Sequence, residues 1–470
     1  MKEGIKEFLI SHAKKNPVSF HMPGHKGSAI FRENGYGDFL DYIMDCDITE
    51  IPGADNLFQT EGIIAHTMER YRKLYETKKS YLLVNGSSSG IISAIMASVC
   101  RDGKLIMARN CHKSVFNALS LGRIQPIYAR PEIIAEYGIL GAVSSNEIAR
   151  CLDENPDAEA VILPSPNYYG ICSDIEKIAH EVHKRNKILI VDQAHGAHLK
   201  FFGKYGFDQL PKAAEEQGAD IVINSIHKTL ASWTQSALLN VCTDRVNQYK
   251  LQECLQMMES TSPSYPLMAS LDINADLLEK KGSVIFEQWM DNLNFFYEEA
   301  GTFQGLVVMQ TLTLDPTKIN IDMSCYGMNG NQLEEYLNEA GIFPELVTGN
   351  IVMCMTGIGN KRVDFEKLQA VLKELSLNRP ISTSEQPEQP PALTETLEHR
   401  PIPQEKVFVP LEKAGGMVCA ASIIPYPPGI PIACPGEVLS DQVIEYVKER
   451  RMAKEKVMGV DETGKVLVGK

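Results

Sequence analysis

Lys228 follows a strongly apolar run in the segment GADIVINSIHKTL (218–230), where a reactive amine could be held at the end of a strand. An ordinary lysine has a pKa near ~10.4 and is a poor nucleophile because it is protonated at neutral pH. At a crowded strand end beside other cations, its pKa can fall and the amine can form an imine with a carbonyl compound. Lys228 alone fits a structural role as well as a catalytic one, so neighbouring motifs must decide.

A carboxylate and an imidazole stand in a second segment, VDQAHGAHL (191–199). The run ILIVD ends at Asp192, and a carboxylate there could pair with the pyridine nitrogen of pyridoxal phosphate (PLP), which must stay protonated for the ring to withdraw electrons. His195 is close enough to reach the phenolic oxygen of that ring or the substrate. A turn or helix cap is the alternative for Asp192, and a satisfied core position is the alternative for His195. The context of Lys228 favours the functional interpretation.

The segment VNGSSSGIISAI (84–95) predicts a strand, a Gly-Ser turn and the start of a helix. Backbone N–H groups at a helix N-terminus, with the hydroxyls of Ser87, Ser88 and Ser89, suit a phosphate group. Simple helix capping is the alternative. The segment lacks the lysine of a nucleotide-binding P-loop, which disfavours a nucleoside triphosphate site.

Two further strand ends carry candidate ring contacts. His112, in ARNCHKSVFNAL (108–119), could stack on the pyridine face, although a surface or capping role is the more common one for an isolated histidine. In PSPNYYGICSD (164–174), Asn167 or Tyr168 could touch the ring oxygen.

These residues need a scaffold that brings strand ends together, and the sequence predicts one. Short β-branched runs alternate with helical patterns, which is typical of parallel βα units in an α/β fold with a mainly parallel, seven-stranded sheet. In such sheets, ligands bind beyond the carboxyl ends of the strands. The predicted strands are 81–86, 104–109, 125–130, 160–166, 187–193, 221–227 and 236–242.

The helical pattern predicts helices over 90–100, 173–186 and 281–301, the second of them with Ser173 as its N-cap. Residues 378–406 are rich in Pro, Ser, Thr and Glu, which indicates a linker. The predicted organisation is an N-terminal arm (1–60), a PLP-binding large domain (61–270), a small α/β domain (271–377), the linker (378–406) and a C-terminal domain (407–470).

Composition narrows the class of protein. The net charge of -14 argues against a nucleic-acid partner, because phosphate backbones are bound by clustered Lys and Arg. No segment has the ~18 to 20 consecutive apolar residues of a membrane span, and the N-terminus does not resemble a signal peptide. The 11 cysteines form no C-x-x-C pair, so we expect no metal site, no disulfide framework and a reducing cytoplasm.

Five blocks together resemble the Orn/Lys/Arg decarboxylase family of aspartate-aminotransferase-like (fold type I) PLP enzymes. They cover most of the chain and are highly specific as a set. The blocks are FHMPGHKG (20–27), DITEIPGADNL (47–57), DQAHGAHL (192–199), SIHKTLASWTQSALL (225–239) and YPPGIPIACPGE (426–437).

The resemblance implies a role for each candidate. Lys228 would be the Schiff-base lysine, Asp192 the partner of the pyridine nitrogen and His112 the stacking residue, with His195 near the ring oxygen or substrate. The residues that would hold the phosphate are Ser87, Ser88, Ser225 and His227. Residues of an N-terminal stretch that approaches the active-site region in this family are secondary candidates, namely His25, Lys26, Asp47 and Glu50.

Two features depart from the family pattern. The family has D-E-A-H where this chain has Asp192-Gln193-Ala194-His195, which removes a negative charge beside Asp192. The chain also begins close to the PGHKG block, so we expect it to lack the N-terminal wing domain of the large inducible decarboxylases and to be similar to Gram-positive biosynthetic arginine decarboxylases.

The implied activity is decarboxylation of a basic amino acid in polyamine biosynthesis, with arginine favoured and lysine or ornithine possible, in at least a homodimer. A cationic side chain would need carboxylates, for which Glu437 and Glu50 are candidates. The alternatives are another fold type I activity, such as an aminotransferase, an aldolase or a decarboxylase of a noncanonical basic amino acid, or a catalytically silent regulator. Retention of Lys228, Asp192 and His112 speaks against the regulator.

Overall fold

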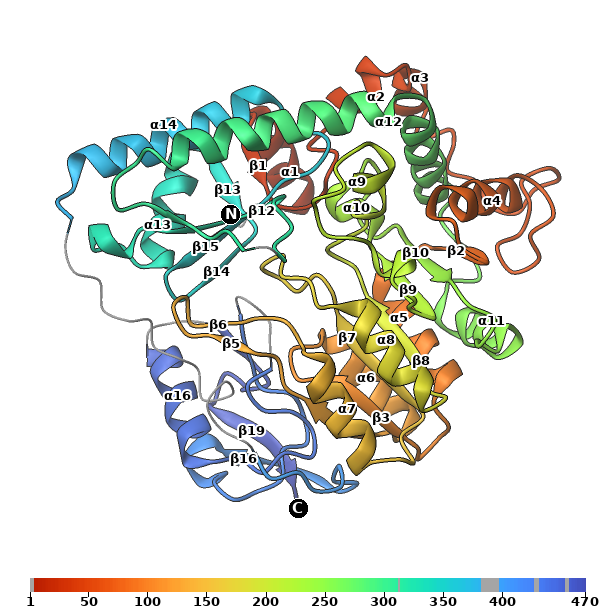
Figure 1. Cartoon of the computed structure of the whole chain (residues 1–470), viewed down its shortest axis with the longest axis vertical. Coiled ribbons are helices and arrows are strands. Elements are labelled where there is room, and N and C mark those ends of the chain that lie inside the picture. The colour runs from red at the N-terminus through yellow and green to blue at the C-terminus, as the bar shows by residue number, and fades with distance from the viewer. Residues whose placement is uncertain (1–3, 312, 382–396, 427–430, 453–455) are drawn as a thin grey trace.

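The computed structural model describes residues 4–311, 313–381, 397–426, 431–452 and 456–470. Its largest sheet has seven strands in the order β2-β10-β9-β8-β7-β3-β4 (Figure 1). Pairings from β9 through β4 are parallel, whereas β10 is antiparallel to both β2 and β9. The strands are β2 (Lys79–Leu83), β3 (Lys104–Ala108), β4 (Gln125–Ala129), β7 (Ala160–Pro164), β8 (Ile188–Asp192), β9 (Ile221–Asn224) and β10 (Ala237–Val241).

Each predicted apolar run forms one strand of this sheet, which confirms the α/β class. The central strands are buried along nearly their whole length, because helices cover them on both faces and no alternating polar face is needed. The edge strand β4 is partly exposed. The helices that share the core of this sheet are α5 (Gly86–Ser98), α6 (Lys113–Gly122), α7 (Ser145–Glu154), α8 (Ile175–Lys184) and α11 (Gln248–Met258).

The predicted N-cap of α8 was wrong. Asp174, not Ser173, caps this helix, since its carboxylate accepts the Lys177 N–H at 3.1 Å. The Ser173 hydroxyl instead accepts the Val143 N–H at 3.0 Å. Both residue types make good caps, and the pairing of Ser173 with a distant loop decided between them.

A second sheet, which is antiparallel, is formed by residues that follow the long helix α12 (Tyr265–Ala300) in the sequence. This helix runs along the top of Figure 1 in green. The domain boundary predicted between residues 270 and 271 falls inside α12. The sheet has the order β11 (Val307–Val308), β12 (Lys318–Asp322), β15 (Ile351–Met355) and β14 (Leu346–Thr348), with helices α13 (Gly330–Glu339) and α14 (Arg362–Asn378).

The N-terminal segment joins this second unit through a parallel pair of strands, β1 (Val18–Phe20) and β13 (Ile342–Pro344). The helices of the N-terminal segment are α1 (Ile5–Lys14), α2 (Ala29–Glu33) and α3 (Gly37–Asp41). Other α-helices and short strands before residue 230 are α4 (Ile63–Tyr75), β5 (Ile133–Ile134), β6 (Ile139–Leu140), α9 (Lys200–Lys204) and α10 (Ile226–Thr229).

The C-terminal unit has a hydrophobic core of its own. Arg109, just past β3, fixes it to the large sheet, because its guanidinium donates to both carboxylate oxygens of Glu437 at 3.0 and 2.9 Å and to the Pro431 carbonyl at 2.6 Å. The elements of this unit are β16 (Lys406–Pro410), β17 (Ile424–Tyr426), α16 (Asp441–Met452), β18 (Lys456–Met458) and β19 (Lys465–Gly469).

Parts of two predicted segments lie outside the described residues, namely 382–396 of the linker and 427–430 of the PPGIP block. Among the helices of the described ranges, none is both long enough and apolar enough to cross a bilayer.

Candidate active site

The predicted site residues gather at one edge of the large sheet. Asp192 ends β8, Lys228 lies in α10 directly after β9, and His112 follows β3. The serines of α5 follow β2, which runs in the same direction as β9 because both are antiparallel to β10. The carboxyl ends of these strands therefore meet at the edge where α/β sheets bind ligands.

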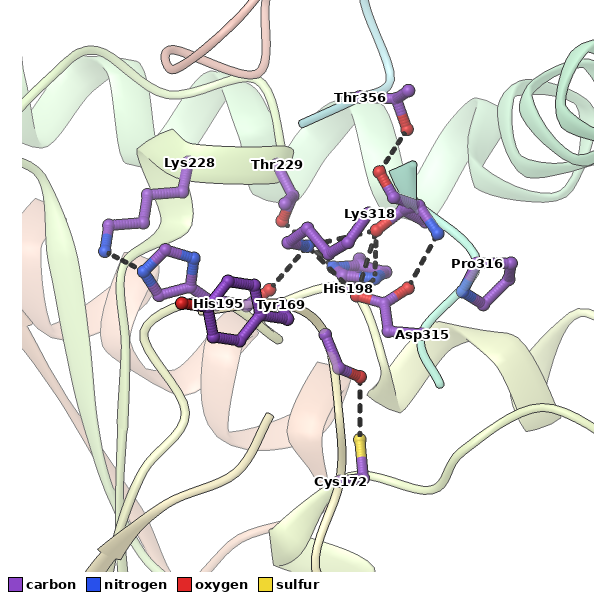
Figure 2. A network of polar contacts seen from close by, with 12 residues as sticks. Tyr169, Cys172, His195, His198, Lys228, Thr229, Asp315, Pro316, Lys318 and Thr356 are labelled. Carbon is purple, nitrogen blue, oxygen red and sulfur yellow. Dashed lines mark hydrogen bonds and ion pairs between the residues drawn. The ribbon is translucent and has the colours of Figure 1, made fainter. Parts of the chain in front are cut away.

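Lys228 and His195 form the centre of this edge (Figure 2). The Lys228 Nζ lies 2.9 Å from the His195 Nε2. Burial lowers the pKa of Lys228, while the charges of Asp192 and Glu345 act in the opposite direction. A lower pKa leaves a larger share of the amine unprotonated at neutral pH, which is the form that attacks a carbonyl group.

His195 is buried and its ring is held from one side. The Tyr168 ring packs edge-on against it, with the ring centroids 5.0 Å apart. Burial, and next the charge of Lys228, lowers the pKa of His195 far below its ordinary value, so the ring is neutral. Its Nδ1 has no hydrogen-bond partner among the described residues. A buried nitrogen without a partner can form a hydrogen bond with a polar group of a bound molecule.

Asp192 is buried near Lys228, with 6% of its surface exposed. One carboxylate oxygen accepts the Ala194 N–H at 3.1 Å. Burial raises the pKa of Asp192, and the nearby Lys228 opposes that effect. A buried carboxylate with a single hydrogen bond is stabilised by a cationic partner, as a protonated pyridine nitrogen would be.

The predicted Gly-Ser turn is instead the first turn of α5, which begins at Gly86, four residues before the predicted helix start at Gly90. Gly86 has a φ of +78° and is the first helical residue, so Ser87 and Ser88 lie in the first turn, half-buried. Ser89 differs, because its hydroxyl is within bonding distance of the Gly86 carbonyl and the Glu259 carboxylate. The Ser89 hydroxyl is therefore already hydrogen-bonded within the protein.

Ser225 and His227, which precede Lys228 in the chain, complete the part of the site that would hold the phosphate. The Ser225 hydroxyl is buried and has no partner among the described residues. The His227 Nδ1–H donates to the Ser236 carbonyl at 2.8 Å, and burial lowers the pKa of His227 to about 4. An unpartnered hydroxyl, the free N–H groups of a helix start, a buried carboxylate and a lysine with a lowered pKa together fit PLP.

His112 caps α6, as the alternative interpretation expected. Its Nδ1 accepts the Ser114 N–H at 3.3 Å, so the ring proton is on Nε2. Burial, and next the charges of Lys228 and Lys113, lowers the pKa of His112 to about 3. The residue is thus a neutral ring beside Lys228 and also the cap of a helix.

Several candidates do not join this group. Glu437 is occupied by Arg109, so its prediction as a substrate-binding carboxylate was wrong. Asp47 and Glu50 are exposed. The Asn167 amide donates to the Leu140 carbonyl at 2.8 Å and accepts backbone N–H groups, so it serves the loop.

Glu345 was missed by the sequence interpretation. Its carboxylate accepts the Met22 N–H at 2.8 Å. Burial raises the pKa of Glu345, while the charges of Lys228 and Lys26 oppose the rise. It follows β13 without a recognisable motif, so only the fold brings it to the site.

The PGHKG block reaches the site from the N-terminal segment. The Gly24 N–H donates to the His227 carbonyl at 2.7 Å, and the Gly24 carbonyl accepts the Gly359 N–H at 3.0 Å. A Cβ at position 24 would collide with the Thr229 backbone, which explains the glycine. Burial lowers the pKa of Lys26 to about 7, and its Nζ donates to the Met355 carbonyl at 3.1 Å.

The departure at Gln193 has a structural reason. Its side chain points away from the site, donating to the Glu215 carboxylate at 2.8 Å and to Asn224 Oδ1 at 3.0 Å, and accepting the Ala214 N–H at 2.7 Å. Glu215 is half-buried, and desolvation of its carboxylate raises its pKa. The amide is therefore a neutral donor to a carboxylate that is partly removed from water.

Gln193→Glu is expected to destabilise the fold by about 1–3 kcal/mol at neutral pH, because two carboxylates would then face each other and both hydrogen bonds that the amide donates would be lost. Their pKa values in the folded state would lie above the unfolded value of about 4.3, so the loss should grow as pH rises above that value. Melting temperatures at pH 5 and 8 test this. The exposed Gln332→Glu is the control, and an equal or pH-independent loss in Gln193→Glu would contradict the explanation.

Comparisons with known proteins identify the fold. The structure of the lysine decarboxylase LdcF of Francisella novicida superposes with a TM-score of 0.78 at 20% identity, covering 98% of this chain and 80% of that one. The fold is therefore that of the fold type I PLP enzymes.

The sequence comparisons identify the family. The Orn/Lys/Arg decarboxylase major domain matches residues 5–300 and the C-terminal domain of the same family matches residues 384–463. YaaO, an uncharacterized protein of Bacillus subtilis, is 33% identical over 98% of this chain and 96% of its own length. The arginine decarboxylase of the same organism is 31% identical over 97% and 95%. The chain belongs to the Orn/Lys/Arg decarboxylase family of PLP-dependent enzymes, which act on basic amino acids.

Proposed function

We propose that the chain removes the α-carboxylate of arginine as CO2 and releases agmatine, with lysine and ornithine as poorer substrates. The observation that carries the chemistry is the contact of 2.9 Å between the Lys228 amine and the His195 ring, beside the buried Asp192. The preference for arginine is supported by the arginine decarboxylase relative, of which the alignment covers 95%.

When bound, PLP supplies the electron sink that stabilises the carbanion left by CO2. The chain's own residues hold that sink in place. Ser87, Ser88 and the N–H groups at the start of α5 would bind the phosphate, and Ser225 would add its unpartnered hydroxyl. Asp192 would keep the ring nitrogen protonated. His112 would flank the ring.

Decarboxylation also requires a proton at the carbon that loses CO2. The Lys228 Nζ and the His195 Nε2 are adjacent titratable nitrogens at the centre of the site. Because the His195 ring is neutral, the ammonium form of Lys228 is the member of this pair that can give up a proton, and its lowered pKa favours that transfer to a carbanion. We therefore assign the proton delivery to Lys228, with the neutral His195 ring as its contact.

A guanidinium group needs a carboxylate at the far end of the pocket. With Glu437 bound to Arg109, the described carboxylate whose charge acts on both Lys228 and Lys26 is Glu345. One of its oxygens accepts the Met22 N–H, and a carboxylate has acceptor sites beyond that single bond. We propose Glu345 as a contact for the substrate cation.

The test is an assay of products with purified protein and PLP. Arginine, lysine and ornithine are supplied separately, and CO2 is measured together with agmatine, cadaverine and putrescine. Agmatine formed with the highest kcat/KM supports the proposal. A product that forms only when a keto acid is added would refute decarboxylation of these substrates, and a higher kcat/KM for lysine would refute the preference for arginine.

We infer that the product, agmatine, enters polyamine synthesis. We also infer that the chain is at least a homodimer. The segment before α4 exposes large apolar side chains, including Met44 at 81%, Ile51 at 54% and Tyr42 at 63%. Apolar side chains gathered in one segment are typical of a surface that a partner covers. Light scattering of the purified protein measures the mass, and a monomer at micromolar concentration would contradict the inference.

A further inference from the structure

A second group of buried titratable side chains lies beside the Lys228 site, next to the backbone of His195 (Figure 2), and the chemistry above does not use it. Lys318, Asp315 and His198 have side chains with 0% exposure. Charges removed from water in this way are costly unless they are paired and hydrogen-bonded. We call these three residues the Lys318 network.

Lys318 connects β12 to the turn that carries His195 (Figure 2). Its Nζ donates to Asp315 Oδ2 at 3.0 Å, to Thr317 Oγ1 at 3.1 Å and to the backbone carbonyl of His195 at 3.0 Å. All three N–H groups of the ammonium are therefore used. The third bond holds the backbone of the residue whose ring touches Lys228.

His198 connects the same network to α10. Its Nε2 is 3.1 Å from Asp315 Oδ2, and its Nδ1 is 3.1 Å from Thr229 Oγ1. A carboxylate accepts only, so the Nε2 carries the proton. Burial lowers the pKa of His198, with Asp315 opposing, so the ring is neutral and its Nδ1 accepts the Thr229 hydroxyl. Thr229 is the residue after Lys228.

The charges within the network are balanced. Burial alone would raise the pKa of Asp315, but the adjacent His198 and Lys318 hold it below its ordinary value. Asp315 is therefore ionised and Lys318 has a counter-charge. One arm of the network ends on the backbone of His195 and the other on Thr229, the neighbour of Lys228, and the side-chain nitrogens of His195 and Lys228 meet at 2.9 Å.

We propose that Lys318, Asp315 and His198 are positioning residues, which fix Lys228 through Thr229 and His195 through its backbone carbonyl, and so couple the smaller sheet to the reactive amine. The inference rests on the proposed function only in taking Lys228 as the lysine that binds PLP. The other titratable groups that face Lys228 are Asp192, His195, His112, His227, Glu345 and Lys318 itself.

Thr229→Val tests the coupling, because it removes one hydroxyl and nearly preserves shape. We expect about a 10-fold fall in kcat, since small misplacements of reacting groups are costly, and a shifted midpoint when the absorption of the PLP-loaded protein is titrated with pH. Thr229→Ser keeps the hydroxyl and should restore both. Thr356→Val is the matched control. It is equally buried, and its hydroxyl bonds only to Trp289 and the Thr317 carbonyl.

The double variant Lys318→Met with Asp315→Asn removes both charges together and leaves no unpaired ion. Because Lys318 lowers the pKa of Lys228, the spectral midpoint should rise in this variant. If Thr229→Val and Thr356→Val behave alike, or if the double variant keeps the wild-type midpoint, the network is only structural and the proposal is overturned. The titration needs no substrate, so failure to convert arginine would refute the proposed function separately.

Discussion

Lys228→Ala is expected to lose essentially all decarboxylation, with kcat falling by about 10⁴-fold. The variant would lack both the amine that attaches PLP and one of the two nitrogens that meet at 2.9 Å, and positioned proton-transfer groups alone contribute up to about 10⁴-fold. The measurements are the rate of CO2 release and the PLP content after borohydride reduction and peptide mapping, which should find the pyridoxyl group on the wild-type peptide containing Lys228.

Lys184→Ala, an exposed lysine on α8, is the control and should retain wild-type kcat and wild-type labelling. Labelling of a different lysine in the wild-type protein would show that the cofactor site has been misassigned. Turnover by Lys228→Ala within 10-fold of wild type would lead to the same conclusion.

Asp192→Asn is expected to lower kcat by about 10²- to 10³-fold, the loss typical of removing one preorganised electrostatic partner. The amide preserves the shape and the bond to the Ala194 N–H, but it cannot stabilise a protonated pyridine nitrogen. We expect the loss in kcat to exceed the change in KM, because the missing charge acts on the electron-rich state rather than on the bound substrate.

Asp208→Asn, at an exposed position, controls for the charge change alone. If Asp192→Asn changed KM and left kcat intact, Asp192 would be a binding residue, and the assignment of the ring-nitrogen partner would fail. A steady-state comparison of both variants with arginine decides between these outcomes.

The large sheet was predictable because its strands are continuous apolar runs that end in polar residues. Such runs arise when both faces of a sheet are buried, and the pattern is local in the sequence. The position of Lys228, Asp192 and His112 at one edge followed from the same topology. Local patterns were less reliable for helix starts, because Ser173 was predicted as the cap of α8, whereas Asp174 caps this helix and the Ser173 hydroxyl bonds to a distant loop.

Contacts between distant segments could not be predicted. Glu437 was a reasonable carboxylate for a cationic substrate until the fold placed Arg109 beside it. Lys318 begins a short strand, a position where lysine is usually exposed. Its burial depends on Asp315, three residues before it, and on His198, which lies far away in the sequence. The spacing of residues gives no sign of the distant partners Arg109 and His198.

The backbone contacts of Gly24 bear on the order in which the chain folds during its synthesis. Three backbone segments meet there, since residue 24 bonds to residues 227 and 359 and the Ile358 N–H donates to the Thr229 carbonyl. A ribosome releases residue 24 long before residue 359, so the nascent N-terminus must wait for its neighbours. Contacts this distant in the chain also slow folding. We therefore expect the Lys228 site to form late in synthesis, after the large sheet has formed.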